Sequence, residues 1–291
     1  MVSFKIWLGD QQLSKNSVDQ YKSNFKVLSD KAGVNVLSDS QEKIIAALKE
    51  LGHKPSTQRT ILATAVAYMA SQKKSTDKIQ QYRRQIQREL FEQKVESNKS
   101  LKDELPSSKQ LLSHELLMYD KGNWRGFVVC NLLRILHSRN LDLQLCLVRD
   151  RNRANKCKDG HNYIVLDDAR KQVLVLRRKY KTVETYGVKR RTMHSKKLYN
   201  ACNQILGEKD HDWLLVSKKG VKVKDADLSR CVCTHTFDNL NEGKYNKVYV
   251  SEVKEVKDFH KLQKISEERG TSIGALIDYY HSDSGGKYFS S

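Results

Sequence analysis

Long apolar runs are missing from this 291-residue sequence. No stretch approaches the roughly 20 apolar residues that an α-helix needs to cross a bilayer. The first residues, MVSFKIWLGDQQ, also lack the long apolar centre of a secretory signal peptide. The sequence therefore predicts an intracellular protein that is not secreted and has no membrane partner. Hydrophobic residues at 38% and charged residues at 30% are typical of an ordered globular protein.

Cysteine pairs with metal-site spacing are also missing. No C-x-x-C occurs, and the C-x3-H spacing of Cys157 and His161 has no second half-site after it. No metal site is expected, and we interpret the cysteines as reduced, buried thiols. The six are Cys130, Cys146, Cys157, Cys202, Cys231 and Cys233.

Acidic residues are too few to balance the basic ones. The chain has 34 Asp and Glu against 53 Lys and Arg, a formal net charge of +19. An excess of this size favours a polyanionic partner, and nucleic acid is the commonest one. A generally basic soluble protein and a membrane-surface binder are the alternatives. RNA ranks below DNA, because the aromatic-rich strand motif of RRM domains is absent from the sequence.

Proline occurs only twice, and one of the two marks a boundary. Pro106 lies in residues 92–108, EQKVESNKSLKDELPSS, which contain almost no apolar residue. This composition predicts a linker. It separates a domain at residues 1–91 from a second domain at residues 109–291 that ends in a Gly/Ser-rich tail, and the length suits two cores.

The first domain is expected to be a bundle of four short helices. Ser17 can cap a helix that ends at Gly33, and further helices follow over residues 41–52 and 56–72 and from about Thr76. The last helix has a polar background and carries basic residues that we predict to contact DNA. These residues are Lys78, Arg83, Arg84 and Arg88.

The second domain is expected to combine helices with a small antiparallel sheet, which makes the fold class mainly α with a small β-sheet (α+β). Leu141, Leu143, Leu145 and Leu147 alternate as in a half-buried strand. A basic loop follows, and three of its residues are further candidate DNA contacts: Arg149, Arg151 and Arg153. The other expected elements are helices at 109–119, 124–136, 196–207 and 225–240, and strands at 162–168, 172–178 and 189–193.

The C-terminal segment 265–281, ISEERGTSIGALIDYYH, combines a short helix, a Gly-Thr-Ser turn and a second helix that ends in two tyrosines. It resembles the nucleophile segment of tyrosine recombinases, the phage-integrase family. The resemblance implies that a tyrosine attacks a DNA phosphate and forms a 3′-phosphotyrosine, without a metal or a nucleotide cofactor. Tyr280 lies nine residues after Thr271, as the family interval requires, so Tyr280 is the candidate nucleophile and Tyr279 its alternate. Thr271 can donate one hydrogen bond to a phosphate oxygen.

Two further strings carry the resemblance, most closely to recombinases of large DNA viruses and their satellites. Arg139 in HSRNLD matches the first family arginine, which would bind the phosphate through both nitrogens. The alternative interpretation is that Arg139 is a loop residue or forms an ion pair with Asp142. Lys181 in KYKTVETYG matches the family's hairpin lysine, which acts as general acid. The alternative interpretation is that Lys181 is a solvent-exposed charge on a hairpin.

The family's second arginine has no counterpart. The [H/K]-x-x-R box has two possible placements here, and both end in lysine. One gives Lys244 and Lys247, with Lys247 33 residues before Tyr280, and we favour it on spacing. The other gives Lys254, 26 residues before Tyr280. A lysine keeps the charge but lacks the planar fork of arginine.

Taken together, the resemblance implies a site-specific recombinase or integrase of a virus or mobile element, whose helical first domain clamps duplex DNA. The family works as a tetramer on paired sites, so we expect a homo-oligomer. A viral protein would act in the host cytoplasm, a viral factory or the nucleus. The alternative is a DNA-binding protein that keeps this scaffold and has lost turnover, which the missing arginine favours.

Overall fold

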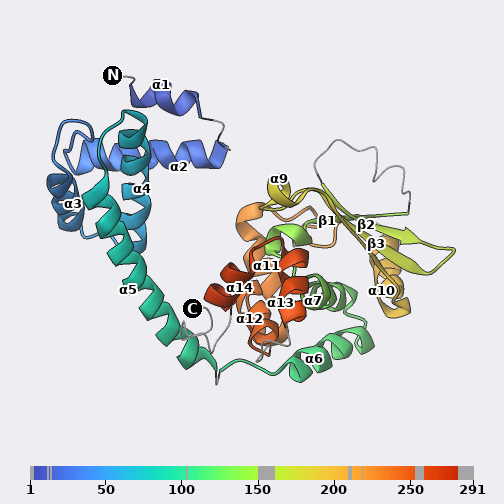
Figure 1. Ribbon diagram of the computed structural model, residues 1–291. Coiled ribbons are helices and arrows are strands. Elements are labelled where there is room, and N and C mark those ends of the chain that lie inside the picture. The colour runs from blue at the N-terminus through green and yellow to red at the C-terminus, as the bar shows by residue number, and fades with distance from the viewer. Residues whose placement is uncertain are drawn as a thin grey trace. The chain divides into compact units, whose positions relative to one another are not determined.

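The computed structural model describes residues 3–11, 13, 15–102, 104–149, 161–208, 212–217, 219–252 and 259–280. It divides the chain into two compact units, Met1–Ser97 and Asn98–Ser291, which we describe separately (Figure 1). Within the described ranges, no helix is both long and apolar enough to cross a membrane.

The first unit is a helical bundle. Its α4 is the central helix, with seven buried side chains over 17 residues, and Pro55 occupies its first turn, where no backbone N–H is needed. The Ser40 hydroxyl caps α3 by accepting a hydrogen bond from Lys43 N at 3.2 Å. The elements are α1 (Phe4–Gly9), α2 (Lys15–Lys26), the π-turn η1 (Val27–Lys31), α3 (Gln41–Glu50), α4 (Pro55–Ser71) and α5 (Asp77–Lys102).

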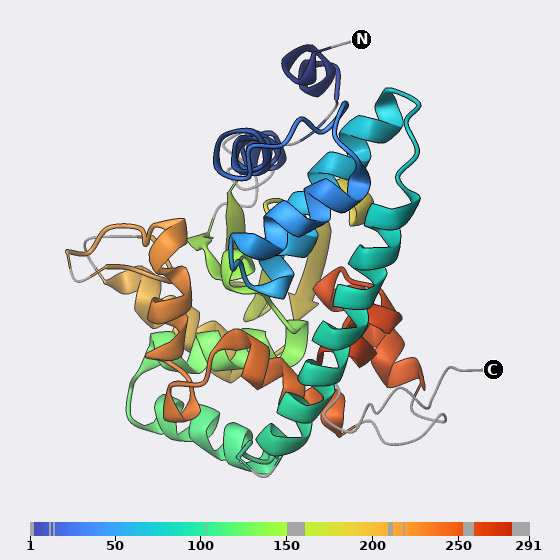
Figure 2. The same cartoon turned by 90° about the vertical axis from the view of Figure 1, so that its left-hand side faces the viewer.

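Helix α5 differs from the predicted linker. It spans 26 residues as one helix, so residues 92–102 are helical, and Figure 2 shows it without a break. Its sequence has no Gly or Pro and is rich in Glu, Gln, Lys and Arg, which are good helix formers. A lack of apolar residues prevents burial but does not prevent an exposed helix, so low apolar content misplaced the linker's start.

The second unit contains a four-stranded sheet in the order β1-β2-β3-β4. The predicted antiparallel arrangement holds for β2–β3 and β3–β4, but β1 and β2 are parallel, so the sheet is mixed. Thirteen residues separate Val148 from Asn162, and a connection of this length permits the crossover that parallel pairing requires. The strands are β1 (Leu145–Val148), β2 (Asn162–Asp167), β3 (Gln172–Arg177) and β4 (Lys189–Met193).

The segment before β1 is shorter as a strand than predicted. Asn140–Leu143 form the 3-10 turn η2, and the strand begins only at Leu145. The Asp142 carboxylate accepts a hydrogen bond from Arg139 N at 3.2 Å and closes this turn. The prediction of a half-buried strand is therefore wrong in burial as well, because Asp142, Gln144 and Cys146 between the leucines are also buried.

Helices cover one face of the sheet. The other elements of the unit are α6 (Ser108–Asp120), α7 (Trp124–Leu136), α9 (Val183–Tyr186), α10 (Lys196–Gly207), η3 (Asp225–Asp227), α11 (Leu228–Cys233), η4 (Phe237–Asn239), α12 (Glu242–Ser251), α13 (Phe259–Arg269) and α14 (Ile273–Tyr280). The predicted helix at 225–240 is split, because Thr236 has an extended conformation between α11 and η4, and Asp238 and Asn239 have positive φ angles. The prediction of a mainly helical fold with a small sheet is confirmed.

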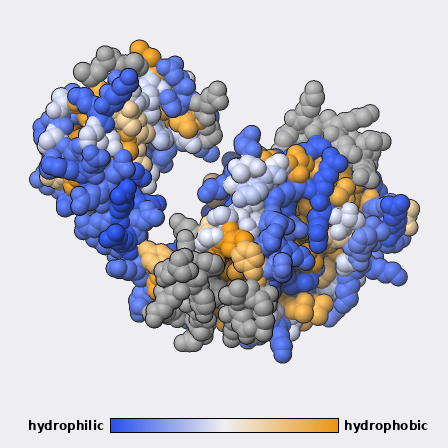
Figure 3. Space-filling model, in the orientation of Figure 1, coloured by the Kyte–Doolittle hydropathy of each residue, from blue (hydrophilic) through white to orange (hydrophobic). Residues whose placement is uncertain are grey.

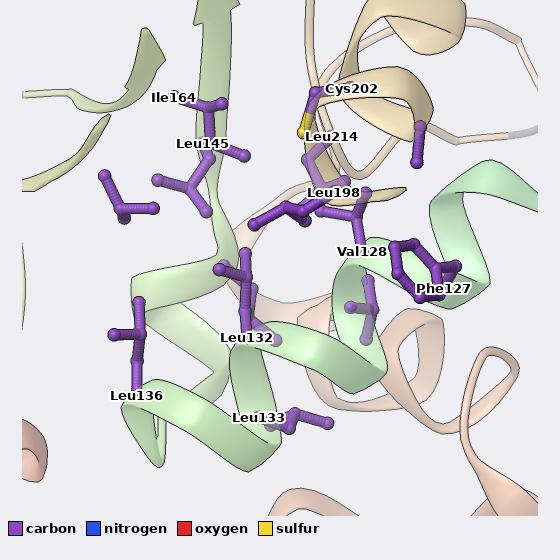
Figure 4. Packing of buried hydrophobic residues seen from close by; sticks show 14 of the residues in the cluster. Phe127, Val128, Leu132, Leu133, Leu136, Leu145, Ile164, Leu198, Cys202 and Leu214 are labelled. Carbon is purple, nitrogen blue, oxygen red and sulfur yellow. The ribbon is translucent and has the colours of Figure 1, made fainter. Parts of the chain in front are cut away.

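The core of the second unit lies between the sheet and helices α7 and α10. Leu145 and Ile164 of the sheet meet Leu132 of α7 and Leu198 of α10 there (Figure 4). Alternate residues of β1 point to the opposite face, where Cys146 joins a smaller apolar cluster. This packing fixes the ends of α7 and β3, from which the candidate site is built.

We expect Leu132→Ala to destabilise the protein by about 2–5 kcal/mol, because Leu132 is 0% exposed and its loss leaves a cavity in a close-packed core. Leu112 on α6 is 41% exposed. Leu112→Ala is the matched control and should cost less than about 1 kcal/mol. Urea unfolding followed by tryptophan fluorescence compares the two, and equal losses would contradict this core assignment.

Candidate active site at the Gly270 turn

The turn between α13 and α14 is closed by its own backbone. Gly270 has φ +65°, a conformation that favours glycine, and its N–H donates to Glu267 O at 3.2 Å. Thr271 N donates to Ser266 O at 3.1 Å. The Ser272 hydroxyl then caps α14 by accepting from Ala275 N at 3.2 Å. The helix that carries the predicted nucleophile thus starts from a defined turn.

Two segments distant in sequence meet this turn at one carbonyl. Arg139 Nη2 lies 3.4 Å from Gly270 O, and Thr182 Oγ1 donates to the same oxygen at 2.7 Å. The structure therefore brings together the predicted first arginine, the segment containing Lys181 and the turn before Tyr280. A Cβ at position 270 would lie only 2.8 Å from Thr182 Oγ1, so the approach requires glycine.

Lys189 adds a second cation at this place. It is the first residue of β4, opposite Arg177 in register. Its Nζ donates to Glu267 O and, at 3.3 Å, to Glu268 O. Burial lowers the pKa of Lys189, and the Arg177 guanidinium lowers it further. An ammonium with a lowered pKa gives up a proton more readily than an ordinary lysine.

Arg177 is the buried centre of the cluster. It is 2% exposed and lies 3.4 Å from Asp142 Oδ2 and 3.1 Å from Glu268 Oε2. Arg191, two residues beyond Lys189 on β4, lies 3.6 Å from Glu268. Burial raises the pKa of Asp142, and the nearby Arg177 opposes that shift. Both carboxylates therefore serve primarily to neutralise Arg177.

The alternative interpretation of Arg139, an ion pair with Asp142, is not what the structure shows. Arg139 offers Asp142 its backbone N–H, while the guanidinium turns to Gly270 O. Arg139 Nη1 is buried and has no hydrogen-bond partner. A buried donor without a partner is costly, and a bound anion would satisfy it.

The position of Lys247 on helix α12 differs from that of the two side chains by which this helix contacts the cluster. The α12 side chains that face it are Glu242, which accepts from Arg269 Nη2, and Asn246, whose Oδ1 lies 3.3 Å from His137 Nδ1. At about 100° per residue, Lys247 projects roughly 140° away from Glu242. Burial lowers the pKa of Lys247, and Lys244 lowers it further. Lys244 lies on the same outer side of the helix.

Arg269 occupies the interior next to Gly270 but is already engaged. It is 2% exposed and donates from Nη1 to His137 O at 2.8 Å as well as to Glu242. Its guanidinium therefore ties α13 to α7 and α12.

The other predicted site residues are dispersed or incompletely described. Lys181 is exposed, in the turn before α9, and Thr271 is half-buried in the Gly270 turn. Tyr279 and Tyr280 are the last two residues of α14, and their side chains lie outside the described part of the structure. Lys254, Arg151, Arg153 and Cys157 also lie outside the described residues.

The predicted DNA contacts of the first unit lie on α5 in different surroundings. Lys78 is paired with Glu42, whereas Arg84 and Arg88 are exposed and Arg83 is half-buried. Figure 3 shows hydrophilic side chains along this helix. A shallow hollow of about 430 Å³ on its outer face is lined by Lys78, Gln81, Tyr82, Arg84, Gln85 and Arg88. In the second unit, Arg149 is held by both oxygens of Asp168 at 2.6 and 2.8 Å.

Lys189, Arg177 and Arg269 were missed from the sequence. A signal existed for one of them, because the period of two in KRRTM places Lys189 and Arg191 on one face of a strand. The sequence contained no such signal for Arg177 and Arg269, because it does not show which arginine side chains are buried. The described residues contain no cluster of three or more His, Cys, Asp or Glu side chains suited to a metal ion.

Comparisons with known proteins give little beyond this geometry. No family model matches the chain, and no curated protein matches it. The structure is similar to the crystal structure of XerA recombinase over 94% of this chain and 90% of that one, with 10% sequence identity and a TM-score of 0.37. A likeness of that size does not by itself establish a shared fold.

We expect Gly270→Ala to lower the stability of the protein by more than the strain of a positive φ angle alone would. The new methyl group would meet Thr182, Tyr180 and Lys189 within 3.4 Å, whereas a Cβ at Gly52, also at positive φ, meets nothing within 4 Å. Gly52→Ala should cost about 1 kcal/mol, and Gly270→Ala at least about 1 kcal/mol more. Thermal unfolding measures both, and an equal effect would argue against the close approach of Thr182.

We expect the stability of the protein to fall between pH 6.5 and 4, in part through His137. Burial lowers the pKa of His137 to about 4. The unfolded chain therefore binds a proton in this window that the folded protein excludes, so stability is full above the window and is lost as pH falls. The contribution is about 3 kcal/mol at most.

His137→Asn isolates this effect, because asparagine tolerates the φ of +46° at position 137. Urea unfolding at pH 7 and pH 4.5 should show a smaller pH-dependent loss in this variant than in the wild type. His194→Asn, at an exposed histidine, is the control. If both variants lose as much stability as the wild type, His137 does not carry the effect.

Proposed function

We propose that this protein is a site-specific DNA recombinase or integrase that cuts and rejoins strands through a 3′-phosphotyrosine at Tyr280. The observation that carries the proposal is the meeting at Gly270 O of Arg139, Thr182 and the turn that starts the tyrosine helix. These groups come from segments 88 and 131 residues away from the turn. A phosphoryl-transfer site needs cations and a nucleophile positioned in this way.

The proposed chemistry is a balanced exchange of two phosphate ester bonds. The Tyr280 hydroxyl releases its proton to water, and its oxygen forms a bond to phosphorus while the bond between phosphorus and the 5′ oxygen breaks. Arg139 holds non-bridging oxygens through its free Nη1, and Lys189 replaces Lys247 as the second cation. Lys181 donates the proton that the leaving 5′ oxygen needs, and the reverse sequence rejoins the strand.

The partner in this proposal is duplex DNA, bound with help from the basic α5 of the first unit. Paired DNA sites would assemble the protein into a homotetramer. A viral or other mobile element is the proposed setting, because the Arg139 and Lys181 strings resemble recombinases of such elements.

A second candidate function is DNA binding without turnover. One observation favours it: both Nη atoms of Arg269, the arginine of α13, already donate to Glu242 and to the His137 carbonyl. If Lys189 does not supply a second positive charge, Arg139 is the one group that binds the phosphate. This protein would then bind DNA with a marked salt dependence and form no covalent product.

The test is a covalent trapping assay on nicked duplexes drawn from repeats that flank the encoding gene. A protein–DNA band should form with the wild type and with Tyr279→Phe and should vanish in Tyr280→Phe. Arg139→Ala should slow its formation about 10²–10³-fold, the usual loss for a group that stabilises transition-state charge. Lys247→Ala should form the band at the wild-type rate, and Lys189→Ala should not.

Two results decide against parts of this scheme. DNA binding without a band on any of the duplexes supports the second candidate function. A band that survives Lys189→Ala but is lost in Lys247→Ala would restore Lys247 as the second cation.

A further inference from the structure

Two arginines lie side by side on neighbouring helices of the first unit. Arg59 is on α4 and Arg83 on α5, and both are half-buried. Arg59 Nη1 reaches across to α5, where Gln87 Oε1 accepts its hydrogen bond at 3.3 Å. Gln87 lies one helical turn beyond Arg83 on α5, so Arg59 reaches the part of α5 that carries Arg83.

Among the described residues, no carboxylate neutralises this pair. Over the described ranges, no ion pair is formed by Arg59 or Arg83, and Arg83 Nε is buried without a hydrogen-bond partner. Other arginines of the protein are paired, as Arg134 is with Glu115 at 2.7 Å and Arg125 with Glu208 at 2.6 Å. Burial lowers the pKa of Arg83, and the neighbouring Arg59 lowers it further. Like charges held together in this way cost stability in the free protein.

We propose that the Arg59–Arg83 pair binds one phosphate group of the DNA backbone. A phosphate placed between the two guanidinium groups would supply the missing negative charge and accept from the orphaned Arg83 Nε. Planar guanidinium groups suit phosphate because their N–H donors match its oxygens in pairs. Two helices hold the pair, so little ordering is needed on binding.

This site is distinct from the outer face of α5. At about 100° per residue, Arg83 projects roughly 140° away from Lys78 and Arg88. Those two line the shallow hollow described above, and Lys78 is already paired with Glu42. The ligand being DNA rests on the proposed function, whereas affinity for a phosphate group rests on the arginine pair itself.

The experiment compares Arg83→Gln and Arg59→Gln with Lys43→Gln on α3, which removes the same charge from a residue that already has a carboxylate partner, Asp39, at 2.8 Å. Binding of a fluorescent duplex is measured by anisotropy over a range of salt concentrations. Each arginine variant should bind more weakly, and its plot of log K against log salt should be shallower by about 0.9, as for one lost phosphate contact. Lys43→Gln should match the wild type.

Two further readouts separate phosphate binding from a structural role. Because both arginines share one phosphate, the double variant should bind little more weakly than either single variant. Arg83→Gln should also unfold at a higher temperature than the wild type, since it removes an uncompensated buried charge. An arginine variant with the affinity and salt slope of Lys43→Gln, or one that only loses stability, would overturn the proposal.

Failure of this inference is distinguishable from failure of the proposed function. A Tyr280-dependent covalent band together with unchanged DNA affinity in both arginine variants would leave the function standing and remove the phosphate site. If the wild type binds no duplex, the function fails, and inorganic phosphate becomes the probe. At matched ionic strength, phosphate should then raise the melting temperature of the wild type over its value in chloride, and not that of Arg83→Gln. Equal shifts would reject the site.

Discussion

The buried guanidinium of Arg177 is the constraint on which the second unit depends. It is held between Asp142 of the η2 turn and Glu268 of α13, so one side chain of β3 joins three segments. Loss of one partner from such a pair typically costs about 3–5 kcal/mol, because a charge is left uncompensated in the interior. Each partner adjoins a site element: Asp142 closes the turn that Arg139 begins, and Glu268 lies two residues before Gly270. The position of Arg139 and that of the Gly270 turn therefore both follow from the placement of Arg177.

Charge around this centre is incompletely balanced. Asp142 and Glu268 are engaged by Arg177, and Glu242 is engaged by Arg269, so the described carboxylates of the cluster are committed to structural arginines. Arg139 and Lys189 are left with backbone carbonyls as their partners. Dipolar partners offset a cation less than a carboxylate does, which leaves a site where an added anion would be favourable. The Arg59–Arg83 pair repeats this condition in the first unit, so the net charge of +19 is partly concentrated in arginines without acidic partners.

The local features of the candidate site could be predicted from the sequence better than its long-range contacts. Arg139 and the Lys181 segment were found because each lies in a short string with its own turn chemistry, and both do reach the Gly270 turn. For the second cation, spacing in the sequence favoured Lys247 and did not point to Lys189, because a sequence does not show which side chains of α12 and β4 turn toward the Gly270 turn. Similarly, the composition of residues 92–102 predicted a linker and did not indicate that α5 continues through them. The four strands were expected near their observed places, while the parallel pairing of β1 and β2 is a long-range choice that strand patterns do not encode.

Among the described residues, the other arginines of the cluster are paired with carboxylates. In the proposed chemistry, Arg139 therefore has to orient the phosphate. A lysine supplies charge through a single rotating ammonium, whereas a guanidinium fixes the orientation of a phosphate through paired donors. With Lys189 as the second cation, orientation would have to come from Arg139 alone, and a misplaced guanidinium would not be corrected by a partner. The structure meets this demand locally: the backbone of Arg139 is held by Asp142, and its Nη2 by Gly270 O. Its Nη1 is buried without a partner, and it is the atom that a phosphate oxygen would engage. A site with one rigid arginine and one or two adjustable lysines is thus a coherent alternative to a pair of arginines, because positional precision is needed in one group and charge in the others.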